Sequence, residues 1–216
     1  MHIEPGLIAP VKLSLAAATA ALVYLRVLPR WLRQPRLWVR TALAAVFFSM
    51  FMQAFHMQVG PSELHFIGAM PVYLSFGYLP AMLGFGIGLF LQALIFEPQD
   101  MVHLAVNTLS LVIPLTVVHW RFGKQTAELN WQRILKLDAV YYSGVTLMVA
   151  FWLSMAEVAT PFSAWLQFAA SYLLVVAAEP VMTLALLSVF RVLRQRPQLP
   201  RWMRVCLDEG RWSARV

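Results

Sequence analysis

Residues 81–96 read AMLGFGIGLFLQALIF, a continuous apolar run without a charged side chain. A helix that crosses the ~30 Å hydrocarbon core of a membrane needs roughly 20 mostly apolar residues. The hydrophobicity of the run is continuous rather than alternating, which favours a helix over a strand of a membrane barrel. The stretch therefore predicts a membrane-spanning helix.

The composition extends this interpretation to the whole chain. Of the 216 residues, 60% are hydrophobic and 12% are charged, whereas soluble domains carry about 25% charged residues. The scarcity of polar residues excludes a disordered chain, and the single cysteine, Cys206, excludes a disulfide scaffold. The net charge of +7 suits a nucleic-acid-binding protein, but so apolar a chain would not stay in water, and we expect no nucleic-acid partner. We predict an all-α polytopic membrane protein.

Further apolar runs predict about seven transmembrane helices in total, of which the third is short and the seventh is long. Residues 1–193 are expected to form one membrane domain, and residues 194–216 a basic cytoplasmic tail. The predicted spans are Ala9–Leu28, Val39–Met57, His65–Gly77, Ala81–Phe96, Met101–Trp120, Leu137–Ala156 and Phe162–Arg191.

The charged residues predict the orientation. If seven helices alternate from an outside N-terminus, every Lys and Arg except Lys12 falls on one side, which the positive-inside rule assigns to the cytoplasm. The C-terminus is then cytoplasmic. The basic residues lie around the first loop (Arg26, Arg30, Arg33, Arg36, Arg40), between the fifth and sixth spans (Arg121, Lys124, Arg133, Lys136) and after the last span, while Glu4, Glu63, Glu97, Asp100 and Glu157 fall outside.

Four of the five histidines fall at or near the outer ends of the predicted helices: His2, His56, His65 and His103; only His119 lies at an inner end. Imidazole is the commonest metal-binding side chain near neutral pH. An external metal site is therefore one interpretation, and four separate polar caps at the membrane surface are the other. Glu63 and His103 are candidates for extra ligands or for ordinary loop polarity.

The first two residues, Met1 and His2, favour the metal interpretation. No basic residue precedes the first apolar run, so we expect no cleavable signal and an intact Met1. The terminal amine, the amide nitrogen of His2 and its ring nitrogen Nδ1 can bind one ion, closing a five-membered and a six-membered chelate ring. Tetragonal nitrogen coordination suits Ni(II) or Cu(II) better than Mg or Ca, and it leaves one equatorial position open for another imidazole.

Three stretches carry a family resemblance. The chain opens with Met1-His2-Ile3 and has glycine at position 6; residues 60–68 read GPSELHFIG; and Gln92-Ala93-Leu94-Ile95-Phe96 is followed by Asn107. These stretches resemble the cobalt/nickel substrate-capture components of energy-coupling factor transporters, the CbiM/NikM family.

The resemblance implies a seven-helix fold in a bacterial or archaeal cytoplasmic membrane, with the N-terminus tucked in from outside. It implies metal ligation by Met1, His2 and His65, with Asn107 holding the N-terminal segment or a ligand ring. The implied function is import of Ni2+ or Co2+ as substrate, without an organic cofactor. The implied partners are a transmembrane coupling subunit and a cytoplasmic ATPase pair, with a small accessory membrane protein as a further candidate.

Other functions follow from the same residues less directly. The chain has no P-loop, so ATP hydrolysis needs separate proteins, and it lacks the usual hydrolase motifs, which favours a non-catalytic subunit. An intramembrane metalloenzyme with Glu63 as general base and a metal-free binding or scaffold protein are the alternatives.

Small residues in two spans predict close helix packing. Gly84 and Gly88 are four residues apart in the fourth span, and Ala17 and Ala21 belong to an alanine-rich face of the first. The alanine-rich face also resembles the surface of the first helix that docks on the coupling subunit in energy-coupling factor systems, which is the alternative to packing within the chain. In the seventh span, Glu179 before Pro180 predicts a hinge or a buried acid bonded to a neighbouring helix.

Overall fold

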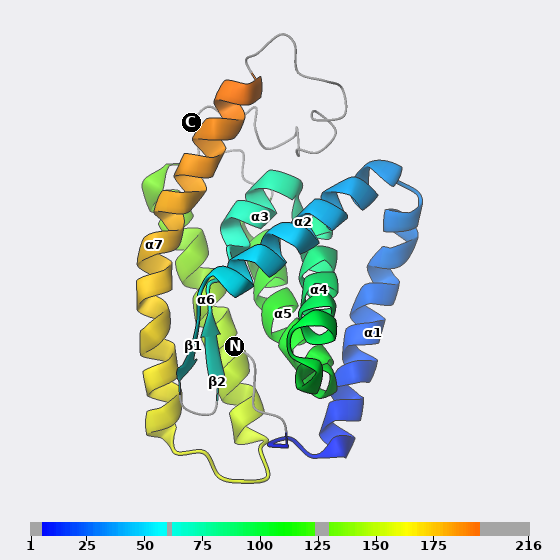
Figure 1. The fold of residues 1–216 in the computed structure, drawn as a ribbon, viewed down its shortest axis with the longest axis vertical. Helices are drawn as coiled ribbons and strands as arrows, with labels where there is room; N and C mark the ends of the chain where they lie inside the picture. Colours follow the sequence, from blue (N-terminus) through cyan, green and yellow to red (C-terminus); the bar gives the residue numbers. More distant parts are fainter. Residues whose placement is uncertain (1–5, 60–61, 124–129, 195–216) are drawn as a thin grey trace.

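The computed structural model describes residues 6–59, 62–123 and 130–194, and these residues form a bundle of helices (Figure 1). Six helices are long and apolar enough to cross a membrane, which confirms an all-α, multi-pass membrane protein. The helices α6 and α7 pack together at one edge of the bundle, and α1 lies at the other (Figure 1). The long helices are α1 (Pro10–Leu32), α2 (Pro35–Ala54), α4 (Tyr78–Ile95), α5 (Leu104–Phe122), α6 (Trp131–Ser154) and α7 (Phe162–Arg194), and a 3-10 turn, η1 (Pro98–His103), leads into α5.

The predicted short third span, His65–Gly77, has a different structure. The chain leaves α2 as a hairpin of β1 (His56–Val59) and β2 (Ser62–His65), and it then forms α3 (Ala69–Phe76). Eight helical residues rise only about 12 Å, less than half of the hydrocarbon core. Every residue of α3 is buried, so this half-helix is apolar because neighbouring helices surround it rather than because it spans the lipid.

Local sequence explains where the elements begin and end. Proline stands at the first turn of α1 and α2, where its missing N–H costs no hydrogen bond. The side chain of Asn130 caps α6 by accepting a hydrogen bond of 2.9 Å from the backbone N–H of Arg133. Gly77, with a φ of 92°, separates α3 from α4, a conformation that glycine adopts without steric cost.

The contact between α2 and α4 is close because α4 carries glycine there. A Cβ atom added at Gly84 would lie 2.6 Å from the Cβ of Ala44, and one added at Gly88 would overlap the ring of Phe48. In α1, by contrast, the buried alanines are Ala16 and Ala20.

The expectation that Ala17 and Ala21 pack within the bundle is wrong, since both are exposed, and the alternative of a face that docks on a coupling subunit stays a prediction. The run of alanines from position 16 to 21 leaves the hydrophobic pattern without a preferred face, so the neighbouring helices decide which alanines are buried.

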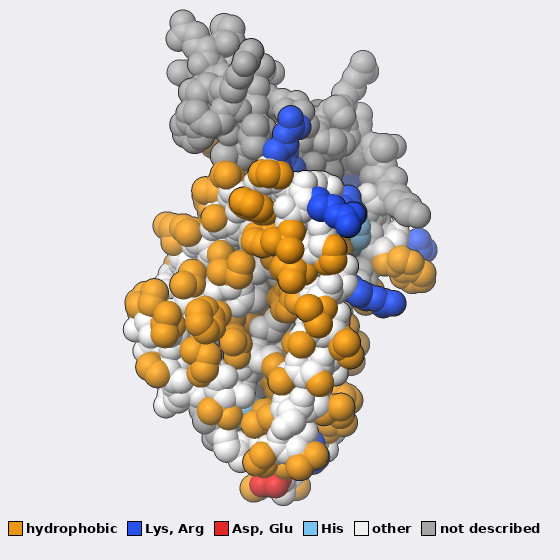
Figure 2. All heavy atoms as spheres, turned by 90° about the vertical axis from the view of Figure 1, so that its right-hand side faces the viewer, with side chains coloured by type: hydrophobic (Ala, Val, Ile, Leu, Met, Phe, Trp, Pro, Cys, Tyr) orange, Lys and Arg blue, Asp and Glu red, His pale blue; other side chains and the backbone are white. Residues whose placement is uncertain are grey.

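Charge is separated along the bundle. The start of α1 and the end of α7 lie at opposite ends of the bundle (Figure 1). On the face shown in Figure 2, lysine and arginine side chains gather toward the end where α7 finishes, and acidic side chains lie at the opposite end. We refer to the end with the hairpin and the start of α1 as the outer end. The predicted tail, residues 194–216, lies outside the described residues apart from Arg194, the last residue of α7.

Candidate metal centre

The β-hairpin positions His65 between the end of α2 and α7 (Figure 1). His65 is the last residue of β2 and pairs with His56 of β1. Side chains two residues apart on a strand share a face, so Glu63 and His65 lie on the same face of β2. The hairpin packs against α2 and α7, and the His65 side chain is held in this contact with 4% of its surface exposed.

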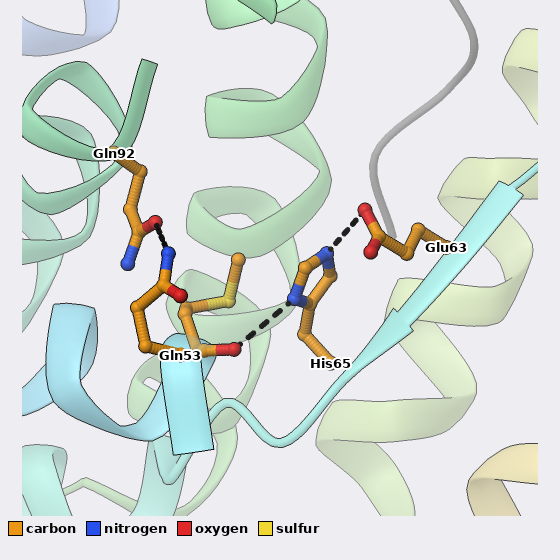
Figure 3. A network of polar contacts seen from close by, with 5 residues as sticks. Gln53, Glu63, His65 and Gln92 are labelled. Atoms are coloured by element: carbon orange, nitrogen blue, oxygen red, sulfur yellow. Dashed lines mark hydrogen bonds and ion pairs between the residues drawn. The ribbon is translucent and has the colours of Figure 1, made fainter. Parts of the chain in front are cut away.

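Both ring nitrogens of His65 face an oxygen atom (Figure 3). Nδ1 lies 3.4 Å from the carbonyl oxygen of Met52, near the end of α2. Nε2 lies 3.0 Å from the carboxylate oxygen Oε2 of Glu63. The ring of His56 is partly stacked on the same imidazole, with 6.1 Å between the ring centroids.

This arrangement favours a positive charge at the ring. A neutral imidazole has one N–H and one lone pair, so a neutral His65 can satisfy only one of the two oxygen atoms. A second proton, or a metal ion on one nitrogen, removes the conflict, and a half-buried carboxylate such as Glu63 stabilises either. His65 and Glu63 together therefore form a site prepared for a cation.

Two glutamine side chains support the end of α2 beside His65 (Figure 3). Gln53 donates a hydrogen bond of 2.7 Å to the side-chain oxygen of Gln92, and Gln92 donates one of 2.8 Å to the carbonyl oxygen of Ser49. These bonds fix the last turn of α2 and with it the carbonyl group of Met52. Gln92 belongs to the stretch that carries the family resemblance, whereas no sequence signal identifies Gln53 or Met52.

His103 and Asn107 lie on the turn η1 and the start of α5. Both side chains are buried, although they belong to polar residues at the end of a membrane helix. The side-chain oxygen of Asn107 has no hydrogen-bond partner in the described part of the chain, and burying such an acceptor costs about 1–3 kcal/mol. The turn η1 packs against α4, and α5 packs against α6, α4 and α1; contact of His103 or Asn107 with a metal-bound ring stays a prediction.

The beginning of the described chain is docked at the same outer end. Ile8 is buried in a cluster with Val106, next to Asn107, and with Trp152 of α6. The carbonyl oxygen of Leu7 accepts a hydrogen bond of 2.9 Å from the backbone N–H of Glu157. The described chain is therefore held against the bundle from Leu7 onward.

Met1 and His2 lie outside the described residues, and so does the sequence-predicted chelate. Within residues 6–59, 62–123 and 130–194, no three His, Cys, Asp or Glu side chains form a group that could hold a metal ion. His65 and Glu63 supply one nitrogen and one carboxylate. A complete transition-metal site at this position needs donors from another part of the chain.

Comparison with known proteins identifies the family of this chain. The family model described as CbiM, cobalt uptake substrate-specific transmembrane region, matches residues 2–199 of this chain. Neither the curated proteins nor the solved structures contain a match. The family match covers the hairpin, all the helices and nearly the whole sequence, and with six membrane-spanning helices it places the chain among transport proteins of the membrane. The chain belongs to the CbiM family of cobalt uptake transmembrane components.

Proposed function

We propose that this chain captures one Ni2+ or Co2+ ion at the outer end of the bundle as the substrate-binding subunit of an energy-coupling factor importer. The observation that carries the proposal is the buried ring of His65, whose two nitrogens both face oxygen atoms. The docking of Leu7 and Ile8 against the start of α5 and the turn after α6 supports it further, because the proposed donors Met1 and His2 precede them by only a few residues in the sequence.

In this proposal the donors are the terminal amine of Met1, the amide and ring nitrogens of His2 and one ring nitrogen of His65. Four nitrogen donors in a plane suit Ni(II) and low-spin cobalt. The chemistry is ligand exchange, so no bond of a substrate is broken and no general acid or base is required. The membership of this chain in a transport family supports this non-catalytic interpretation over an intramembrane metalloenzyme.

The neighbouring polar residues orient the ligands. A metal-bound imidazole normally donates its other N–H to a carboxylate or carbonyl, and Glu63 and the Met52 carbonyl are the two acceptors that flank His65. We assign Asn107 to a similar role for the N-terminal segment, since its side-chain oxygen is buried and has no donor in the described chain. His103 is a further candidate of this kind.

Energy for transport comes from other proteins in this proposal. A transmembrane coupling subunit and a cytoplasmic ATPase pair reorient the loaded module, with a small accessory membrane protein as a further candidate partner. The N-terminus then faces outward and the C-terminus the cytoplasm, as the basic residues at the inner end predict.

A pair of histidine variants tests the function. Purified protein is titrated with Ni2+ and Co2+ by calorimetry, as wild type, as His65→Ala and as His119→Ala. We expect His65→Ala to weaken binding by at least about a hundredfold, because a metal ligand is lost. His119 stacks on Tyr78 at 4.0 Å at the inner end, and we expect its removal to leave the affinity unchanged. Equal losses in both variants would contradict the proposal.

A further inference from the structure

The buried acid Glu179 of α7 lies against the start of the half-helix α3. Its Oε1 accepts a hydrogen bond of 2.8 Å from the backbone N–H of Met70, and the backbone N–H of Ala69 donates to the same carboxyl group. The first N–H groups of a helix have no partner within the helix, and Gly68, which precedes α3, has no side chain to supply one. Glu179 therefore caps α3 from another helix. This confirms the expectation of a buried acid bonded to a neighbouring helix, while the hinge at Pro180 stays a prediction.

Helix α6 holds the carboxyl group of Glu179 from the other side. The hydroxyl group of Tyr142 donates a hydrogen bond to Oε2 of Glu179. The carboxyl group of Asp138, one turn earlier on α6, is also hydrogen-bonded to Glu179, and such a bond between two carboxyl groups requires a proton on one of them. With donors from α3 and α6 around it, the Glu179 side chain has a fixed orientation, and it ties α7 to both elements.

The chain between His65 and Met70 is closely packed. The backbone N–H of Phe66 donates a hydrogen bond of 3.1 Å to the carbonyl oxygen of Phe55, at the end of α2. Gly68 has a φ of 62°, a conformation that favours glycine, and a Cβ atom added there would overlap the ring of Phe51. Closely packed segments transmit a displacement rather than absorb it, so a shift at the start of α3 reaches the ring of His65.

Helix α7 also contacts the other end of this segment. The hydroxyl group of the buried Tyr172 is hydrogen-bonded to the backbone of His65. Tyr172 and Glu179 are seven residues apart, which places them about 10 Å apart along α7. The same helix packs against both strands of the hairpin and against α3 (Figure 1). One helix thus holds both ends of the segment that carries the candidate ligand.

We propose that Glu179 and Tyr172 are positioning residues of the outer metal centre, which hold the ring of His65 in place from α7. The inference rests on the proposed function, because it takes His65 as a metal ligand. Neither side chain binds the ion; each acts through the backbone group to which it is hydrogen-bonded. Metal ligands must be held to within about 0.5 Å of their productive positions, so loss of either contact lowers the affinity for the ion.

A matched pair of tyrosine variants tests the inference. The full-length Tyr172→Phe and Tyr141→Phe proteins each lose one hydroxyl group from a buried tyrosine, but Tyr172 is the tyrosine that meets the backbone of His65. Competition with a chelator measures the Ni2+ affinity. We expect Tyr172→Phe to weaken binding by about three- to tenfold, the usual worth of one hydrogen bond, and Tyr141→Phe to leave the affinity unchanged.

The residual Ni2+ binding of His65→Ala separates positioning from a general loss of stability. In that protein the ring that Tyr172 positions is absent, so Tyr172→Phe should cause no further loss of affinity, as expected for residues that act as one unit. A further loss of the same size would overturn the inference, because Tyr172 would then act elsewhere.

Two substitutions of Glu179 provide a second test. Glu179→Ala removes the acceptor for the N–H of Met70, and we expect at least about tenfold weaker Ni2+ binding. Glu179→Gln keeps an acceptor oxygen and should restore most of the affinity. Should Glu179→Ala fail to fold, the tyrosine pair decides alone.

The outcomes distinguish this inference from the function on which it rests. Equal Ni2+ affinities in Tyr172→Phe and Tyr141→Phe would overturn the positioning role, as would equal losses in folded Glu179→Ala and Glu179→Gln. Wild-type affinity in His65→Ala would instead contradict the proposed function, because the ring would then not be a ligand.

Discussion

At the scale of single residues, the chemistry of the outer site depends on what flanks one imidazole. Glu63 lies 3.0 Å from Nε2 of His65, and the hairpin register keeps both side chains on one face of β2. A carboxylate at this distance fixes the orientation of the ring and raises its ability to bind a metal ion. We therefore predict that Glu63 supports metal binding in a way that a neutral side chain cannot fully replace.

Replacing Glu63 by glutamine tests this role. Glu63→Gln keeps the shape of the side chain and removes its charge, so we expect Ni2+ binding to weaken by about 10- to 100-fold while the protein remains folded. Competition titration against a chelator measures the affinity. Glu157→Gln, an exposed position at the same end, serves as the control, and identical affinities in the two variants would show that the Glu63 carboxylate has no part in binding.

The sequence identifies candidate functional residues only where the side chain itself has distinctive chemistry. Histidine at position 65 is conspicuous because few imidazoles occur in so apolar a chain, but its position relative to Glu63 depends on the strand β2, which the sequence did not predict. The carbonyl group of Met52 also faces the ring, but every residue carries a carbonyl group, so no pattern distinguishes it. Asp138 is fully buried in α6, but it is the second residue of the predicted span Leu137–Ala156, where an acid gives no sign of burial, whereas α6 begins at Trp131.

At the scale of elements, the close contact of α2 with α4 depends on two glycines. Gly84 faces Ala44 and the backbone of Ala45, with distances of 2.6 Å and 3.0 Å from an added Cβ. No rotamer change relieves a clash with a Cβ atom and a backbone nitrogen, so the helices themselves must separate. Small residues permit this kind of approach between membrane helices.

Alanine substitutions at two glycines of α4 measure this contact. We expect Gly84→Ala to lower the free energy of unfolding by about 1–3 kcal/mol, the usual cost of overpacking, as measured by thermal unfolding in detergent. At Gly86 an added Cβ meets the hydroxyl end of Tyr24, which can move, so Gly86→Ala should cost less. A larger loss at Gly86 than at Gly84 would contradict the packing described here.

Element prediction failed at one place for a physical reason. The long spans are evident because about 20 apolar residues in succession match the thickness of the hydrocarbon core. The segment from His65 to Gly77 is also apolar, but α3 is enclosed by α2, α4, α6 and α7. A hydropathy pattern reports only that a segment avoids water, and it does not distinguish lipid from protein. The hairpin before α3 was missed because its strands contain four residues each.

At the scale of the whole molecule, the charge distribution predicts how the bundle lies in its membrane. On the face shown in Figure 2, most basic side chains gather toward the end where α7 finishes, and cytoplasmic loops carry such an excess of Lys and Arg. The hairpin and the turn before α7 then face outward. This orientation is required if the hairpin meets metal ions from outside the cell.

Single-cysteine labelling checks the orientation. In a Cys206→Ser background, Val158→Cys lies in the turn between α6 and α7 with 68% of the native side chain exposed, and Arg33→Cys lies in the exposed turn after α1. We expect a membrane-impermeant maleimide to label position 158 in intact cells and position 33 only after permeabilisation. Labelling in the reverse order would mean that the hairpin faces the cytoplasm.

The central claim concerns the first residues, which must reach the ring of His65 with a free amine. Calorimetric titration with Ni2+ compares the protein that begins at Met1 with one that carries a single additional residue before it. The additional residue moves the amine out of the chelate ring, and we predict that the affinity falls by at least about a hundredfold while the unfolding temperature without metal stays the same. Equal Ni2+ affinities in the two proteins would exclude the terminal amine as a ligand and contradict the proposed site.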